Sequence, residues 1–226
     1  ILKTKIKMAI PKVIYQTYKD KIPWYTHFII WRFRRKNKDF QYEFYNDEQV
    51  DSFIKNNFPS EIYHAYSRLQ IGAAKADFFR YAILYKKGGV YLDIDSDILI
   101  DLNTFIQPDD KAILTYEKNN KVYAQWAMFY EKGHPFLKET IRFIVHNIQH
   151  NKYPHNVHAT TGPSIYTAAV RRVILKDPDV SFRMTTKNYK GKLRFKYIMA
   201  RILMNKLINP EYWKRKQLTT PVVRPE

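Results

Sequence analysis

The chain has 226 residues, 45% of them hydrophobic, which is enough sequence for one sizeable folded domain. It contains no cysteine, which excludes a disulfide framework and a thiolate zinc site and is compatible with a cytoplasmic, reducing compartment. Its formal net charge of +18 favours a partner that carries negative charge, such as a phosphate-bearing substrate, an anionic membrane surface or nucleic acid.

No apolar stretch of the sequence approaches the roughly 20 residues that span a bilayer. The basic opening, residues 1–10, lacks the cleavage pattern of a signal peptide. We therefore expect a cytoplasmic protein that is soluble or bound peripherally to a membrane.

The first part of the chain alternates predicted strands and helices. Residues 12–17 form a short apolar run typical of a buried strand, and residues 40–46 alternate aromatic and polar side chains like a second strand. Residues 24–36, aromatic and basic, are expected to form a helix between them. Asn46 can cap a further helix over residues 46–58.

Residues 68–89 give the strongest helix prediction of the chain. They are rich in alanine, carry lysines in the last turn and end at Gly88 and Gly89, which suit a helix stop and a close backbone approach. The helix leads directly into the apolar run at residues 90–95. Such helix and strand units predict an α/β domain whose parallel strands place ligands at their carboxyl ends.

Four later elements are predicted: strands over 112–116 and 123–130, and helices over 134–148 and 161–175. Beyond Pro178 the sequence becomes very basic, with no clear strand pattern. We therefore divide the chain into a catalytic-type domain, residues 10–177, and a basic, partly helical C-terminal extension, residues 178–226.

Three aspartates, Asp93, Asp95 and Asp97, alternate at the end of the predicted strand 90–95. Alternate strand positions point to one side, and two carboxylates at one site attract a hard cation such as Mn²⁺ or Mg²⁺. Such a cation can neutralise the charge that grows on a diphosphate leaving group. An Asp-x-Asp pair is also a common polar strand end, so the pair alone does not decide between the two.

Upstream, Asp77 and Arg80 are three residues apart in the predicted helix 68–89, so their side chains share one helical face. The simplest interpretation is a local ion pair worth a few tenths of a kcal/mol. The alternative is a pair that lies beside a ligand.

Five segments, in this order, resemble the glycosyltransferases that carry the DXD sugar-binding region: IPKVIYQTY, YEFYNDEQV, AAKADFFRYAILYKKGGVYLDIDSD, GHPF and TTGPSIYTA. This group includes yeast-type α-mannosyltransferases, bacterial capsule and lipooligosaccharide transferases and, more distantly, the glucosylating clostridial toxins. The similarity covers residues 10–175, and the stretch 73–97 is its most specific part. The resemblance implies a GT-A-like α/β fold of the Rossmann type that binds a nucleotide-sugar.

The resemblance assigns roles to matching residues. Asp93 and Asp95 look like the DXD pair, with Asp95 as the direct ligand of Mn²⁺ (or Mg²⁺) and Asp93 as the contact to ribose and metal-bound water. Asp77 and Arg80 match the family's Asp-x-x-Arg, implicated in binding the donor sugar. Because of this motif, we favour the interpretation that Asp77 and Arg80 lie beside a ligand over that of a local ion pair.

Further matching positions lie elsewhere in the chain. Tyr15, Gln16 and Thr17 match the end of the first strand, where the nucleotide commonly sits, although Tyr15 can equally be a core residue. Thr161 belongs to a loop near the acceptor side in the family. Many relatives close the donor site with a His and Trp motif near the C-terminus, and here Trp213 has no histidine beside it in sequence.

Together these matches imply a metal-dependent glycosyltransferase that uses a UDP- or GDP-linked sugar and a glycan or glycolipid acceptor. The family is generally retaining, and no obvious nucleophile supports a covalent intermediate, so front-face displacement is the simpler mechanism.

Two other functions remain open at this point. A phosphatase of the HAD type also follows an apolar strand with Asp-x-Asp, but usually near the start of its domain. Nucleic-acid binding would need a recognition module, and the lysines here are diffuse, so no nucleic-acid partner is expected.

The basic stretch 190–216 carries apolar residues at helical spacing and many cations. It is expected to form a helix that either packs on the domain or lies on an anionic membrane surface.

Overall fold

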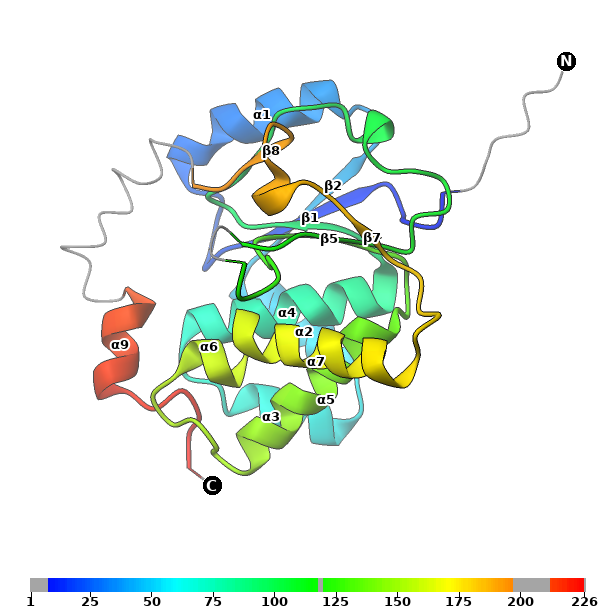
Figure 1. Cartoon of the computed structure of the whole chain (residues 1–226). Coiled ribbons are helices and arrows are strands. Elements are labelled where there is room, and N and C mark those ends of the chain that lie inside the picture. Colours follow the sequence, from blue (N-terminus) through cyan, green and yellow to red (C-terminus); the bar gives the residue numbers. More distant parts are fainter. Residues whose placement is uncertain (1–7, 118–119, 197–211, 226) are drawn as a thin grey trace, which may run out of the picture.

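The computed structural model describes residues 8–117, 120–196 and 212–225 (Figure 1). Its centre is a six-stranded sheet in the order β2-β1-β3-β6-β5-β7. The strands are β1 Val13–Thr17, β2 Gln41–Tyr45, β3 Gly89–Leu92, β5 Ala112–Leu114, β6 Ala127–Tyr130 and β7 Arg183–Met184. Only the pairs that β6 makes, with β3 and β5, are antiparallel. The predicted α/β sheet with mainly parallel strands is confirmed.

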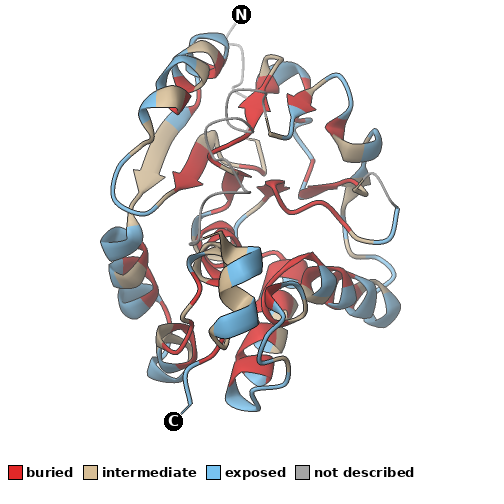
Figure 2. Cartoon of the chain, turned by 90° about the vertical axis from the view of Figure 1, so that its left-hand side faces the viewer, coloured by how far each residue is buried: buried red, intermediate tan, exposed pale blue. Residues whose placement is uncertain are grey.

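Helices cover both faces of this sheet (Figure 1). One face carries α1 (His27–Lys36), which continues the short 3-10 helix η1 (Trp24–Thr26). The other face carries the remaining helices of the domain: α2 Asp47–Asn57, α3 Ser60–Ser67, α4 Gly72–Lys87, α5 Pro135–Gln149, α6 Val157–Thr160 and α7 Pro163–Lys176. Buried residues line the sheet and the inner sides of the helices, whereas exposed residues lie on their outer sides (Figure 2).

Successive side chains of the central strands point to opposite faces of the sheet, so the core has two layers, one on each face. Tyr15 of β1 and Tyr91 of β3 pack with the helices of the larger layer. Ile14 and Val90, their neighbours in sequence, pack on the α1 side. Because β1 and β3 are parallel and adjacent, the residues that follow them emerge at one edge of the sheet.

The junction between α4 and β3 requires the two glycines, as predicted. Gly88 and Gly89 have φ angles of +70° and +110°. A Cβ on Gly88 would lie 2.7 Å from the backbone nitrogen of Lys132, and one on Gly89 would lie 2.8 Å from the carbonyl oxygen of Val13. The glycines thus allow α4 to turn directly into the sheet.

The predicted cap of α2 is also present. Asn46 accepts a hydrogen bond at Oδ1 from the backbone N–H of Gln49 at 2.8 Å, and the Gln49 side chain accepts from the Asn46 N–H at 2.9 Å. This reciprocal capping box fixes the start of the helix after β2.

The region beyond Pro178 departs from the sequence analysis, which found no strand pattern there. β7 adds a sixth strand to the sheet, and β8 (Leu193–Arg194) pairs with β4 (Asp97–Ile98) as a separate two-stranded ribbon. Strands of two residues are too short to show periodicity, which explains why the pattern missed them.

The described C-terminal residues also join the core. Val222 and Val223 are buried, and Val223 bridges to Leu69, just before α4. The short helix α9 (Trp213–Thr219) precedes them. Most of the helix expected in the stretch 190–216 lies outside the described residues.

Candidate active site

The carboxyl ends of β1 and β3 come together through Gln16. This side chain is fully buried, and its Nε2 donates to the backbone oxygen of Asp93 at 3.2 Å. Its Oε1 accepts from the hydroxyl of Tyr42 on the edge strand β2 at 3.0 Å. The backbone of the first predicted aspartate is therefore anchored by three adjacent strands.

Arg80 of α4 lies beside the same strand end. Its Nη2 is 3.0 Å from Oδ1 of Asp77 and 3.1 Å from Oδ1 of Asp93. Its Nη1 donates to the backbone oxygen of Gln125 at 2.9 Å, and its guanidinium lies 4.8 Å from the centre of the Tyr91 ring. Since Asp77 and Arg80 are each only 5% exposed, this is a buried network and not a surface ion pair.

Asp77 receives two further hydrogen bonds from distant parts of the chain. Gln125 donates from Nε2 to Oδ1 at 2.9 Å, and Thr161 donates from Oγ1 to Oδ2 at 3.1 Å. The hydroxyl of Tyr81 in turn donates to Oε1 of Gln125. The sequence analysis did not identify Gln125, because no local pattern marks a residue that acts 48 positions away from its partner.

Burial controls the charge states of this network. It raises the pKa of Asp77 to about 6, although Arg80 and the hydrogen bonds from Thr161 and Gln125 act in the opposite direction. It also raises the pKa of Asp93, against the attraction of Arg80 and Lys196. For Arg80, burial alone would lower the pKa, but Asp93, Tyr91 and Asp77 together raise it, so the guanidinium stays charged.

Asp93 and Asp95 lie in a turn and not in a strand, because β3 ends at Leu92. The Asp93 N–H donates to the oxygen of Trp126 at 2.7 Å, and the Ser96 N–H donates to the oxygen of Asp93 at 2.9 Å. The Asp93 side chain is 25% exposed, compared with 6% for its partner Arg80. Asp93 is thus the member of the network that solvent or a ligand can reach.

Asp97 does not share this arrangement, which corrects the expectation that all three aspartates point to one side. Its carboxylate pairs with Arg32 of α1, on the other face of the sheet from α4. Burial raises the pKa of Asp97, and Arg32 opposes this rise. The side chain is fully buried, so it fixes α1 to β4 and is not open to a ligand.

Residues 23–116 match the family model described as "Glycosyltransferase sugar-binding region containing DXD motif". They include α4, the turn after β3, the buried Asp77 and Arg80, and the partly exposed Asp93. The chain therefore carries the DXD sugar-binding region of glycosyltransferases.

Similar proteins agree with this assignment. An initiation-specific alpha-1,6-mannosyltransferase of Schizosaccharomyces pombe is 31% identical over 71% of this chain and 48% of its own length. Inositol phosphoceramide mannosyltransferase 3 of the same organism is 31% identical over 73% of this chain and 47% of its own length. The chain thus spans about half the length of these curated relatives.

The fold is also that of a glycosyltransferase. The solved structure named PaToxG Glycosyltransferase superposes with a TM-score of 0.60 over 96% of this chain and 81% of that one, at 18% identity. The mixed α/β architecture is therefore the GT-A type that the sequence predicted.

The donor set of the DXD region fits a hard divalent cation. Asp93 and Asp95 offer carboxylate oxygens, the ligand type that Mn²⁺ and Mg²⁺ prefer. Over the ranges that the structure describes, no group of three histidine, aspartate or glutamate side chains forms a complete metal cluster. Asp93 and Asp95 are the residues of this region that would hold such an ion.

The other residues predicted for donor binding occupy different environments. Tyr15 is 1% exposed and packs edge-on against Tyr45, with ring centres 6.3 Å apart, which matches the core-packing alternative. Thr17 donates from Oγ1 to the oxygen of Tyr45 at 2.8 Å.

Tyr25 lies on the Asp95 side: its pKa is raised by burial, by Tyr18 and by the charge of Asp95. Tyr25 is thus an additional aromatic residue near the DXD turn.

Trp213 has a histidine beside it in space, although it has none in sequence. The ring of His158 stacks on Trp213 with centres 5.2 Å apart and an angle of 25° between the planes. His158 comes from α6, the helix that leads to Thr161. The fold therefore assembles a His and Trp pair from two distant segments, so the pair cannot be recognised from residues adjacent in sequence.

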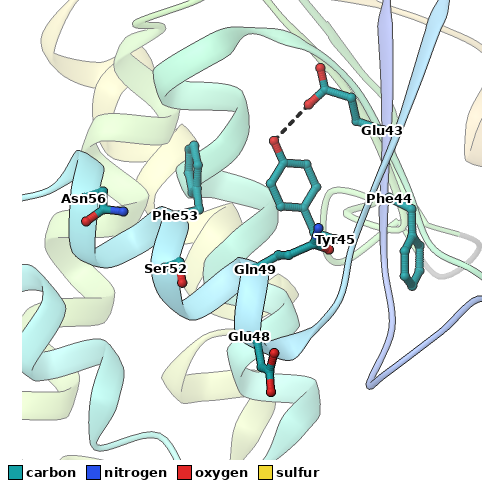
Figure 3. A pocket seen from close by; sticks show the side chains of 8 residues that line it. All are labelled: Glu43, Phe44, Tyr45, Glu48, Gln49, Ser52, Phe53 and Asn56. Carbon is teal, nitrogen blue, oxygen red and sulfur yellow. Dashed lines mark hydrogen bonds between the residues drawn. The ribbon is translucent and has the colours of Figure 1, made fainter.

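A surface groove of about 560 Å³ lies between β2 and α2 (Figure 3). Its lining consists of Glu43, Phe44, Tyr45, Glu48, Gln49, Ser52, Phe53 and Asn56. None of these residues belongs to the DXD turn or to the Arg80 network, so the groove is a separate feature of the surface.

Proposed function

We propose that this chain transfers a sugar from a nucleotide-sugar to a hydroxyl group of a glycan or lipid-linked acceptor. The observation that carries the proposal is Arg80, which bridges Asp77 and Asp93 at the carboxyl end of β3. A buried cation held beside an accessible carboxylate at a sheet switch is suited to a polar, phosphate-bearing ligand. Asp77, Arg80 and Asp93 would contact the donor, and Gln16 would position Asp93 through its backbone.

The relatives guide the choice of donor. Both proteins described above are named mannosyltransferases. A mannose donor linked to GDP is therefore the first to test, with UDP-linked sugars as the alternative. The name of one relative includes inositol phosphoceramide, which supports a glycolipid as a candidate acceptor.

The proposed reaction keeps the α configuration of the donor. The bond between the sugar C1 and the diphosphate oxygen breaks, and the acceptor oxygen bonds to C1 on the same face. The acceptor proton passes to the departing phosphate oxygen. A divalent ion held by Asp95 and Asp93 would supply charge neutralisation on the diphosphate. Arg80 would orient Asp93 and the donor sugar without taking up or releasing a proton.

Peripheral membrane association remains part of the proposal, supported by the net charge of +18. Across the described residues, no helix is both long enough and apolar enough to cross a membrane. A cytoplasmic site of action fits the cysteine-free sequence. The division into residues 10–177 and 178–226 also remains a proposal about sequence organisation.

The test is hydrolysis of a panel of GDP- and UDP-sugars with and without Mn²⁺, for the wild type and for Arg80→Gln. Arg172→Gln is the matched control, because the Arg172 side chain is 47% exposed and pairs with Glu139 at 2.8 Å. We expect donor hydrolysis by the wild type and the control and a large loss in Arg80→Gln. Release of phosphate from a phosphomonoester, with no nucleotide-sugar turned over, would support the phosphatase alternative.

A further inference from the structure

The outer side of η1 and α1 carries three large exposed aromatic residues. Trp24, Phe28 and Trp31 are 73%, 64% and 52% exposed, and their spacing places them along one side of the helical segment. Ile30 and Phe33 lie on the opposite side and are buried in the core. The helix is therefore apolar on both its inner and its outer side, whereas a surface helix normally turns polar residues to solvent.

The same segment is strongly basic. Between Lys21 and Lys38 the sequence contains six lysines and arginines and no acidic residue. The guanidinium of Arg35 lies 5.0 Å from the centre of the Trp31 ring, and Phe28 stacks on Trp31 with centres 5.7 Å apart. Aromatic rings and positive charges thus share one surface.

A groove of about 500 Å³ runs beside this surface. Its apolar lining consists of Ile22, Ile30, Trp31, Phe40 and Tyr42, and its other lining residues are His27, Arg34, Arg35 and Lys38. The groove therefore combines apolar area with positive charge, which suits an amphiphile that has an anionic head group.

We propose that the η1–α1 surface, formed by Trp24, Phe28, Trp31, Arg35 and Lys38, docks on an anionic phospholipid bilayer. Tryptophan and phenylalanine side chains enter the interfacial region of a bilayer, and nearby cations are attracted to anionic head groups. A nucleic acid would use the cations equally well but would leave the three rings without a matched apolar environment.

The position of this surface gives docking a consequence for the candidate active site. Arg32, in the middle of α1, pairs with Asp97, the first residue of β4 and only two residues after Asp95 of the DXD turn. Docking through η1 and α1 would therefore hold the DXD turn near the lipid surface, where a lipid-linked acceptor lies. This consequence rests on the proposed function, whereas the docking itself does not.

The test is cosedimentation of the full chain with phosphatidylcholine vesicles, with and without phosphatidylserine, in the absence of any sugar donor. We expect binding only to the anionic vesicles. Arg35→Gln with Lys38→Gln should reduce binding roughly 25-fold, because each cation near an anionic surface contributes roughly fivefold. The triple variant Trp24→Ser, Phe28→Ser and Trp31→Ser should reduce binding at least as much. Because it removes apolar contacts and no charge, its binding should stay below that of the wild type at every salt concentration.

The control variant is Leu175→Ser with Leu218→Ser, which removes exposed apolar residues elsewhere. It should bind like the wild type.

A second measurement reports insertion of the rings directly. Lipids brominated in their acyl chains should quench the tryptophan fluorescence of the wild type but not of Trp24→Phe with Trp31→Phe, which keeps an aromatic surface and so still binds. Equal vesicle binding by the wild type and the triple serine variant would overturn the proposal. Tighter binding to duplex DNA than to anionic vesicles would do the same. Because no donor is present, neither result bears on sugar transfer.

Discussion

Thr161 and Asp77 are 84 positions apart in the sequence, and the Thr161 hydroxyl donates to Oδ2 of Asp77 at 3.1 Å inside the protein. This contact joins the loop before α7 to the helix that carries Arg80. Together with Gln125, it determines how the Asp77 carboxylate is turned toward the guanidinium.

Thr161→Val should therefore weaken donor binding. The valine keeps the volume of threonine but removes a hydrogen bond to a buried charged group, so we expect the variant to lose about 1–3 kcal/mol of stability and to raise the Michaelis constant for the donor. Thr160→Val is the matched control, since Thr160 is buried and its hydroxyl donates to backbone oxygens of Tyr153 and Asn156 and not to a carboxylate. The interpretation fails if both variants lose stability and show the same donor kinetics.

Asp77→Asn should affect the stability of the fold and the affinity for the donor with opposite dependence on pH. The folded pKa of Asp77 is raised by burial to about 6, above its ordinary 3.8. The stability that its proton supplies is thus fully present below the unfolded pKa and is lost as pH rises through 6. Asn cannot ionise, so the free energy of unfolding of the variant lacks this loss. Between about pH 4 and about pH 7 it should therefore rise relative to that of the wild type by up to about 3 kcal/mol, which chemical denaturation at several pH values measures.

Donor affinity should change in the opposite sense. The ionised carboxylate holds Arg80, so wild-type affinity should fall as pH drops below about 6, the folded pKa of Asp77. Asp77→Asn should bind weakly with little pH dependence in this range. Titration of a nucleotide-sugar at several pH values measures both, and a wild-type affinity that is flat across pH 6 would contradict this role for Asp77.

Asp95→Asn should abolish sugar transfer and leave the fold intact, because it removes a charged metal ligand and no core volume. Binding of Mn²⁺ in the presence of a nucleoside diphosphate, followed by calorimetry, gives a readout that does not depend on turnover. Asp109→Asn, at an exposed position, is the control. Full Mn²⁺-dependent activity in Asp95→Asn would remove this residue from the site.

Arg32→Met should destabilise the protein, because it leaves the buried Asp97 carboxylate without its main partner. Breaking a fully buried pair costs 3–5 kcal/mol, and since Arg32 is 34% exposed we expect a smaller loss of about 1–3 kcal/mol. Adding Asp97→Asn should recover most of it. Chemical denaturation of the two single variants and the double variant measures this coupling, and strictly additive losses would show that the pair contributes no interaction energy.

The sequence predicted those parts of the site that depend on local pattern. Asp77 and Arg80 share a helical face because of their spacing, and Gly88 ends α4 where the lysines and glycines indicated. The parts that were missed depend on contacts between distant segments. Gln125 and the pair of His158 with Trp213 have no local signature, since only the folded sheet and α6 bring them to their partners.

The error on Asp97 has a related cause. Strand periodicity was extended past Leu92, but β3 ends there and the chain turns before β4. Side chains at alternate positions point to the same side only while the backbone remains extended. The turn leaves Asp93 beside Arg80 of α4, whereas Asp97 pairs with Arg32 of α1.

The bridge between Leu69 and Val223 has a consequence for synthesis of the protein. The backbone N–H of Gln70 donates to the oxygen of Val222, and that of Arg224 to the oxygen of Arg68, so the segment that leads into α4 is completed by residues made more than 150 positions later. Contacts of such long sequence separation form late and slow folding. While a ribosome is still translating the stretch before residue 223, the helix that carries Asp77 and Arg80 lacks this support and exposes part of its apolar surface, which is when chaperones would be most needed.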